Sequence, residues 1–253
     1  MISQDTIKKL AIRYHTSEFP NVSREYLQHL FLSALYKISG AEKLLFKGGT
    51  ALRIAYGSPR FSEDLDFSIF GVEQRDRKKF IEDLFTKALA EIEQSGIKVT
   101  LGPKPGATAE GYYGDATFSM YDYPPIAVSI NISARNNRDI KGEVDSVAND
   151  FVPTYNIFHL PQEFLVEEKI FDALLKHKKA RDFYDLYFIM RKGLLTNDQK
   201  TRLNQKKQEI AEYAEATDFT GELSAFLPPD QQAIVRDFKS NLINELNRQL
   251  SGI

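Results

Sequence analysis

The spacing of apolar residues changes between a helical and an extended period along the chain, and this pattern is the first guide to the fold. Near the N-terminus, apolar positions three and four residues apart predict helices over residues 3–14 and 23–38. Ser3 and Ser23 are expected as their N-caps, because a serine hydroxyl can accept a hydrogen bond from a free N–H group of the first helical turn. The second helix shows the helical spacing at Leu27, Leu30, Phe31, Ala34, Leu35 and Ile38.

The middle of the chain combines short apolar runs with one long amphipathic segment. Residues 76–95 predict a helix that ends at Gly96, with an apolar face formed by Phe80, Leu84, Ala88 and Ile92. Residues 102–111 are rich in glycine and proline and predict a loop. Strands are predicted over residues 44–46, 65–70, 97–101, 112–120 and 126–133.

The character of the sequence changes after residue 134. Residues 135–150 are polar and are expected to form a connection. Helices are then predicted over residues 161–177, 181–192, 196–216 and 230–250. The expected fold class is therefore α+β, with a mixed sheet and the N-terminal helices in residues 1–150 and a C-terminal helical domain in residues 151–253.

Composition and charge narrow the class of protein. The chain has 253 residues, 42% hydrophobic and 27% charged, as an ordinary globular protein has. It contains no cysteine, which excludes disulfides and thiolate metal sites and fits a reducing cytoplasm, so a cytoplasmic protein is expected. No apolar run approaches the ~20 residues that cross a membrane, and the N-terminus lacks the apolar segment of a signal peptide. A net charge of −2 gives no overall attraction to nucleic acid, so any RNA contact needs a local basic patch.

The segment KGGTALRIAYGSPRFSEDLDF (residues 47–67) combines a glycine turn with two closely spaced aspartates. Gly48 and Gly49 allow a sharp turn and the close approach of a phosphate to backbone N–H groups. Asp64 and Asp66 are two residues apart, so both carboxylates would point to one face of a strand. Neighbouring carboxylates repel each other unless a cation neutralises them, and Mg²⁺ is the usual cation beside phosphates. The combination is typical of phosphoryl or nucleotidyl transfer, whereas a lone aspartate pair is more often a turn.

Three further residues of this segment are candidates for phosphate binding. Thr50 is expected to cap a short helix that ends at Gly57, to contact phosphate, or both. If the strand alternation extends backwards, Ser62 shares the face of the aspartates and donates to a phosphate oxygen. Arg60 would bind a triphosphate through two hydrogen bonds. The alternatives are a local turn hydrogen bond for Ser62 and a surface ion pair between Arg60 and Glu63.

These motifs resemble the signature of the nucleotidyltransferase superfamily, and more narrowly that of the AbiEii/AbiGii-type abortive-infection toxins of type IV toxin–antitoxin systems. Such proteins carry GGTAL followed by RxSxDLD, which residues 48–52 and 60–66 match. They also carry a later Glu-Lys pair on a helix and then RDxxDL, which residues 168–169 and 181–186 match. The resemblance covers about the first three-quarters of the chain, and the segment from about Gly193 onward matches no motif.

The resemblance implies roles that spacing alone leaves open. By spacing, Lys169 lies at the margin of an apolar helix face, where it either reaches across a cleft towards phosphate or snorkels to solvent. The resemblance makes it a ligand for the phosphates of the nucleotide. Asp182 and Asp185 share one helical face and become active-site carboxylates, between which the sequence does not choose. The helical domain is thereby expected to contribute Lys169 and the RDxxDL motif to the active-site cleft.

The chain departs from the superfamily pattern at one position. Many members carry a third carboxylate on a later strand, where it can act as general base on the attacking hydroxyl. The best-placed strand here, residues 128–132, has Ser129 and Asn131 instead. Either Asp182 or Asp185 acts as the general base, or the reaction does not need one, or the enzyme is impaired.

The expected activity is Mg²⁺-dependent transfer of a nucleotide from a nucleoside triphosphate (NTP) to an acceptor hydroxyl, with one or two metal ions bound by Asp64 and Asp66. The resemblance suggests the 3′ end of tRNA as acceptor and a toxin that a separately encoded antitoxin protein neutralises. A basic cluster at residues 176–181 is a candidate RNA contact, although such clusters are usually solvated surface. The alternatives are nucleotidylation of a protein or small molecule, and a nucleotide-binding module without turnover.

Overall fold

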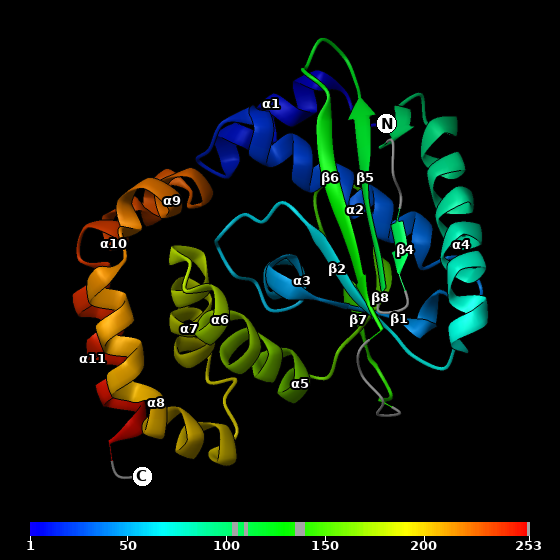
Figure 1. Ribbon diagram of the computed structural model, residues 1–253. Coiled ribbons are helices and arrows are strands. Elements are labelled where there is room, and N and C mark those ends of the chain that lie inside the picture. Colours follow the sequence, from blue (N-terminus) through cyan, green and yellow to red (C-terminus); the bar gives the residue numbers. More distant parts are fainter. Residues whose placement is uncertain (103–105, 109–110, 135–139, 252–253) are drawn as a thin grey trace. The chain divides into compact units, whose positions relative to one another are not determined.

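The computed structural model describes residues 1–102, 106–108, 111–134 and 140–251, which divide by their internal contacts into two compact units (Figure 1). The first unit comprises residues 1–57 and 61–160. The second comprises residues 58–60 and 161–253. The short segment 58–60 therefore belongs by its contacts to the second unit, although the chain on either side of it belongs to the first.

The first unit is built on one mixed β-sheet. Its described strands are β1 (Leu44–Lys47), β2 (Leu65–Ile69), β3 (Lys98–Leu101), β4 (Gly106–Thr108), β5 (Gly111–Ser119), β6 (Ile126–Ser133), β7 (Glu143–Val147) and β8 (Tyr155–His159). They follow the order β3-β5-β6-β2-β1-β8-β7, and β4 pairs with β5. The central strand β2 is antiparallel to β1 and parallel to β6. The predicted α+β class with a mixed sheet is confirmed.

The two faces of this sheet differ in polarity over β2, β6 and β5. Along β6, Val128, Ile130 and Ile132 are buried, whereas the alternate residues Ser129 and Asn131 are partly exposed. The other elements of the unit are α1 (Gln4–Arg13), η1 (Glu18–Val22), α2 (Ser23–Leu35), η2 (Ala41–Lys43), α3 (Gly48–Ile54) and α4 (Gln74–Gln94).

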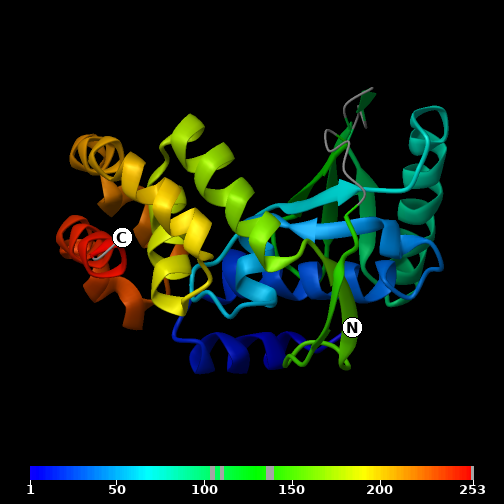
Figure 2. The same ribbon diagram turned by 90° about the horizontal axis from the view of Figure 1, so that it is seen from below.

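Two helices, α2 and α4, pack against each other and supply apolar cover for the sheet (Figures 1 and 2). The ring of Phe85 in α4 meets Phe31 of α2 and Tyr112 of β5 edge to face. The buried positions of α4 recur at helical spacing, as the amphipathic pattern predicted. The opposite, polar face of β2, β6 and β5 carries side chains that could bind a ligand, among them Asp66 and Asn131.

One of the two predicted serine caps is correct. The hydroxyl of Ser3 accepts a hydrogen bond from the N–H group of Thr6 and caps α1. The prediction for Ser23 is wrong, because the η1 turn runs directly into α2 and Val22 precedes the helix in helical conformation. Ser23 is instead fully buried.

Two predictions for the irregular parts of this unit are wrong. The polar stretch 135–150 was predicted to be a connection, but it contains β7. The next strand, β8, lies in residues for which no helix or strand was predicted. β7 is an edge strand with four exposed residues, so it shows no apolar alternation. The predicted loop 102–111 contains the short strand β4, and residues 103–105 and 109–110 of that loop lie outside the described part.

The second unit is helical. Its elements are α5 (Gln162–Glu167), η3 (Glu168–Leu174), α6 (Leu175–His177), α7 (Ala180–Lys192), α8 (Asn197–Ala216), α9 (Phe219–Phe226), η4 (Pro229–Gln231), α10 (Gln232–Arg236) and α11 (Phe238–Leu250). Phe183, Phe219 and Phe238 meet in its core. The sequence did not predict α9, and the single helix predicted over residues 230–250 is divided at Asp237. Within the described residues, the helices are too short or too polar to span a bilayer.

A buried histidine makes the first unit sensitive to acid. His29 of α2 is 5% exposed, its Nδ1 lies 2.7 Å from the Tyr155 hydroxyl, and its ring lies beside Phe151. Burial, together with the smaller effect of Arg53 and against the opposing charge of Glu25, lowers the pKa of His29 to about 4. In the unfolded chain the same group takes up a proton near its ordinary pKa of about 6.5.

Protonation of His29 in the unfolded state should therefore favour unfolding as the pH falls from about 6.5 to about 4. The stability is fully present above this window, and the loss across it is about 3 kcal/mol. In denaturant unfolding, the free energy of unfolding should fall less between pH 7 and pH 4.5 for His29→Gln than for the wild type. His15 is exposed, and His15→Asn is the control: its free energy of unfolding should fall between pH 7 and pH 4.5 by as much as that of the wild type. If His29→Gln also loses as much as the wild type, His29 is not the group responsible.

Candidate active site

The turn after β1 is packed directly against a carboxylate of β2. Lys47 pairs with Asp66 across the antiparallel β1–β2 ladder, and Gly48 follows with φ of +82°. A Cβ at Gly48 would lie 2.2 Å from Oδ2 of Asp66, which is inside any allowed contact. Only glycine meets both demands, because it alone adopts positive φ readily and has no Cβ. The turn thus holds the Asp66 carboxylate against backbone.

The segment before β2 is held by two buried side chains. Nε2 of Gln28 donates to the carbonyl oxygens of Ser62 and Glu63 at 3.0 and 3.1 Å, and the Thr50 hydroxyl donates to the carbonyl oxygen of Asp64. Gln28 is 1% exposed and Thr50 fully buried. Three successive carbonyl groups leading into β2 are therefore held by donors on α2 and α3.

This arrangement corrects two predictions about the segment. Thr50 lies inside α3, which begins at Gly48, so it is not the cap, and its hydroxyl positions Asp64 rather than facing solvent. The strand alternation does not extend back to Ser62, because β2 begins at Leu65 and the preceding residues are irregular. Asp66 therefore lies within the strand and Asp64 directly before it.

An ion pair connects α3, which follows the turn, to α2. Arg53 of α3 donates from Nε and Nη2 to the two carboxylate oxygens of Glu25 on α2, at 2.6 and 2.9 Å. The guanidinium of Arg53 also lies 3.9 Å from the ring centre of Phe61. Glu25, Gln28 and Arg53 were not predicted from the sequence. Polar residues among the apolar positions of the helix 23–38 were the available signal for Glu25 and Gln28, whereas Arg53 of α3 had none.

Asn131 occupies the position beside Asp66. β2 and β6 run parallel with Asp66 opposite Asn131, and Nδ2 of Asn131 donates to Oδ1 of Asp66 at 3.0 Å. The amide therefore orients the carboxylate, a role that a third carboxylate could not fill without a bound cation or proton between the two groups.

The donor set of this turn fits a hard cation shared with a substrate. Among the described residues there is no group of three or more Asp, Glu, His or Cys side chains that could hold a metal ion. Mg²⁺ in phosphate-processing sites is commonly bound by one or two carboxylates, with substrate oxygens and water completing its shell. Asp64 and Asp66 match that requirement.

In the second unit, Asp185 of α7 is the centre of a buried ion cluster. It accepts hydrogen bonds from Nε and Nη2 of Arg60 at 2.9 and 3.0 Å, and from Nζ of Lys169 at 2.8 Å. The side chains of Arg60 and Asp185 are 3% and 1% exposed, and that of Lys169 is 14% exposed. Burial alone would raise the pKa of Asp185, but the charges and hydrogen bonds of Arg60 and Lys169 outweigh it and hold that pKa below its usual range.

The structure distinguishes the two aspartates that the sequence could not. Asp182 lies at the start of α7, where its carboxylate accepts the N–H of Lys179 at 3.4 Å. Burial raises the pKa of Asp182, against the opposing charge of Lys169. Both arms of the Arg60 guanidinium are paired with Asp185, and the Arg60 side chain is buried rather than at the surface; its binding to a triphosphate stays a prediction.

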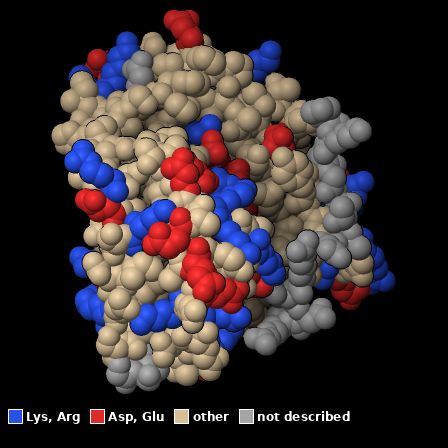
Figure 3. All heavy atoms as spheres, turned by 60° about the vertical axis from the view of Figure 1, so that its left-hand side comes forward, with Lys and Arg blue, Asp and Glu red and all other residues tan. Residues whose placement is uncertain are grey.

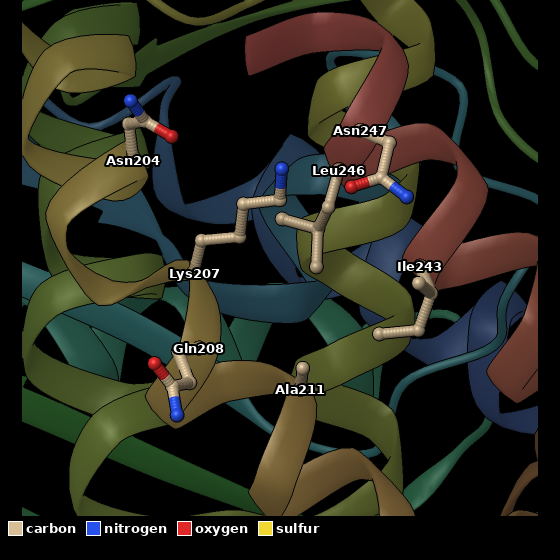
Figure 4. A pocket seen from close by; sticks show the side chains of 7 residues that line it. All are labelled: Asn204, Lys207, Gln208, Ala211, Ile243, Leu246 and Asn247. Atoms are coloured by element: carbon tan, nitrogen blue, oxygen red, sulfur yellow. The ribbon is translucent and has the colours of Figure 1, made fainter. Parts of the chain in front are cut away.

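The basic cluster at residues 176–181 is partly neutralised within its own unit. Lys176 pairs with Asp172, Arg181 with Glu222, and Nζ of Lys178 lies 3.6 Å from the ring centre of Tyr213. Figure 3 shows basic and acidic side chains interspersed on the face turned toward the viewer. A cavity of about 330 Å³ between α8 and α11 contains none of the predicted site residues; Figure 4 shows its lining, Asn204, Lys207, Gln208, Ala211, Ile243, Leu246 and Asn247.

The fold is shared with two solved structures from Helicobacter pylori. One, a candidate nucleotidyltransferase, is 18% identical over 92% of this chain and 95% of its own, with a TM-score of 0.64. The other, JHP933, is 19% identical over 92% of this chain and 92% of its own, also with a TM-score of 0.64. A comparison with curated proteins gave no match.

The family follows from the sequence. Residues 30–250 match the family described as nucleotidyl transferase AbiEii toxin, type IV toxin–antitoxin system. The protein belongs to this family of enzymes, which confirms the resemblance drawn from the two motifs. The match also continues well past Gly193, where no motif was recognised.

Loss of the Gln28 amide should loosen the aspartate segment. Gln28→Ala leaves two carbonyl groups without their buried donor, at a cost of about 1–3 kcal/mol. Gln199→Ala is a matched control, because Gln199 is also 1% exposed and donates to the carbonyl oxygen of Glu163 in the second unit. Both variants should lose stability in denaturant unfolding, but only Gln28→Ala should also lower affinity for a metal-bound NTP. Equal affinities would show that Gln28 has no positioning role.

Loss of Asp185 should destabilise the helical unit strongly. Asp185→Ala leaves two cations without their buried partner, which typically costs about 3–5 kcal/mol. Asp172→Ala, which breaks the exposed pair with Lys176, should cost no more than about 1 kcal/mol. Urea unfolding followed by far-ultraviolet circular dichroism compares the two, and similar losses would contradict the buried cluster.

Proposed function

We propose that this enzyme transfers a nucleotide from an NTP to the 3′ end of tRNA in a Mg²⁺-dependent reaction. The observation that carries the proposal is the Asp66 carboxylate, held between the Gly48 backbone and the Asn131 amide in a chain of the AbiEii family. A carboxylate oriented so closely, next to a glycine turn and a second aspartate, is suited to binding a metal-bound triphosphate.

Asp64 and Asp66 would hold the metal. When bound, Mg²⁺ neutralises negative charge on the phosphates and polarises the phosphorus under attack. The Asn131 amide and the Gly48 turn keep Asp66 in one orientation before substrate arrives, and preorganisation of this kind lowers the cost of binding. Gln28 and Thr50 do the same for Asp64 through the backbone.

The remaining motif residues divide into ligands and supports. Backbone groups at Gly48 and Gly49, the Ser62 hydroxyl and the Lys169 ammonium would meet the phosphates, as the family motifs imply. Arg60 and Asp185 would hold the helical unit together and orient Lys169 through the hydrogen bond that Asp185 accepts from its Nζ.

The proposed transfer is a direct displacement at the α-phosphorus, with no covalent enzyme intermediate. The acceptor oxygen forms a bond to the α-phosphorus while the bond from that phosphorus to the bridging oxygen breaks, and pyrophosphate leaves. The proton of the acceptor hydroxyl passes to a base. Asp182 is better suited to this than Asp185, because its pKa is raised whereas that of Asp185 is lowered by two cations.

The biological role proposed is that of a toxin held in check by a separately encoded antitoxin. Support comes from membership in a type IV toxin–antitoxin family. Modification of a tRNA 3′ end would block its use in translation, which would account for toxicity. Nucleotidylation of a protein is the alternative acceptor chemistry, since the same donor site would serve it.

A transfer assay tests the proposal. Purified protein is incubated with Mg²⁺, total RNA and each α-labelled NTP in turn, and label should enter a tRNA-sized band. Asp66→Ala should lower this transfer by about 10³-fold or more, since a bound metal contributes several kcal/mol to the transition state.

The exposed Asp122, changed to Asn, is the matched control and should retain full transfer. Label that enters protein instead of RNA would replace the tRNA proposal by the alternative acceptor. Transfer that persists in Asp66→Ala would contradict the assigned metal ligand.

A further inference from the structure

A row of three side chains crosses the polar face of the sheet from the predicted metal ligand. Asp66 of β2 is in register with Asn131 of β6, and Asn131 is in register with Tyr113 of β5. Side chains paired in register lie on the same face of a sheet. Tyr113 therefore lies two strand spacings from Asp66, about 10 Å between backbones, on the same face.

Tyr113 is the exposed aromatic residue of this row. It is 54% exposed, whereas its neighbour Tyr112 points to the apolar face and is 7% exposed. Its ring is therefore open to solvent on the face of the sheet that it shares with Asn131 and Asp66. A nucleotide whose phosphates lie at Asp66 would reach the Tyr113 ring if its sugar and base extended along this face of the sheet.

The Tyr113 ring is tethered by a small polar network. Its hydroxyl donates to Oδ1 of Asp115 at 3.3 Å, and the Ser129 hydroxyl donates to the same oxygen at 2.6 Å. Asp115 and Ser129 are paired in register on the same face. A tethered ring loses less rotational freedom when a ligand covers it, which makes it a better platform than a free one.

We propose that Tyr113 is a stacking platform for a nucleobase, with Asp115 and Ser129 as the residues that hold its ring. The inference rests on the proposed function and extends it from the phosphates to the base. The ligand is a purine or pyrimidine ring that stacks on the phenol, and because every base has a π-face, the platform is tolerant of base identity. The base belongs either to the NTP or to the terminal nucleotide of the RNA.

Equilibrium binding with matched ligands tests this subsite. Wild type, Tyr113→Ala and Tyr113→Phe are titrated with a non-hydrolysable NTP, with inorganic tripolyphosphate, which has no base, and with RNA, all in Mg²⁺. Tyr113→Ala should weaken NTP binding by about ten-fold, the typical effect of losing one stacked base, and leave tripolyphosphate binding unchanged. Tyr113→Phe keeps the ring and should bind nearly as the wild type does.

Two further comparisons complete the test. Val144→Ala is the matched control, because Val144 is equally exposed at 54% on β7, and its NTP affinity should match that of the wild type. A loss for RNA in place of NTP in Tyr113→Ala would support the platform and identify the RNA terminus as the source of the base. Unchanged binding of both ligands in Tyr113→Ala would overturn the inference alone, whereas a wild type that binds no nucleotide would overturn the proposed function as well.

Discussion

The contact between the Gly48 backbone and the Asp66 carboxylate is the constraint on which the candidate site depends. It joins β1 to β2 at the point where the chain turns into α3, and no side chain larger than hydrogen fits there. The carboxylate is consequently confined on one side by backbone and on the other by the Asn131 amide. A confined carboxylate has little orientational entropy to lose when a cation binds.

Other buried polar pairs hold the segments around the turn in place. Gln28 and Thr50 hold consecutive carbonyl groups of the aspartate segment, and Arg53 bonds Glu25. Each of these groups would be costly to bury without its partner, so the pairs specify one arrangement of the loop. In the helical unit Asp185 is the buried group that holds its neighbours in one arrangement, since its negative charge compensates the charges of Arg60 and Lys169.

The sequence predicted those features that local pattern determines. Amphipathic spacing identified α4, and the glycine turn with its aspartate pair identified the segment that contains Gly48 and Asp66. The edge strand β7 was missed because four of its five residues are exposed, so its sequence shows no alternation of apolar and polar positions. The partners of Arg60 and Asn131 could not be predicted, because they are set by pairings between residues far apart in the chain, 125 and 65 positions respectively.

The most direct test of the account is the binding of Mn²⁺, a paramagnetic substitute for Mg²⁺, followed by electron paramagnetic resonance with and without a non-hydrolysable NTP. The wild type should bind Mn²⁺ strongly only when the nucleotide is present, because two carboxylates alone do not complete the shell of the ion. Asp66→Asn keeps the shape of the side chain and should abolish that binding. Undiminished Mn²⁺ binding by Asp66→Asn in the presence of nucleotide would show that Asp66 is not a metal ligand.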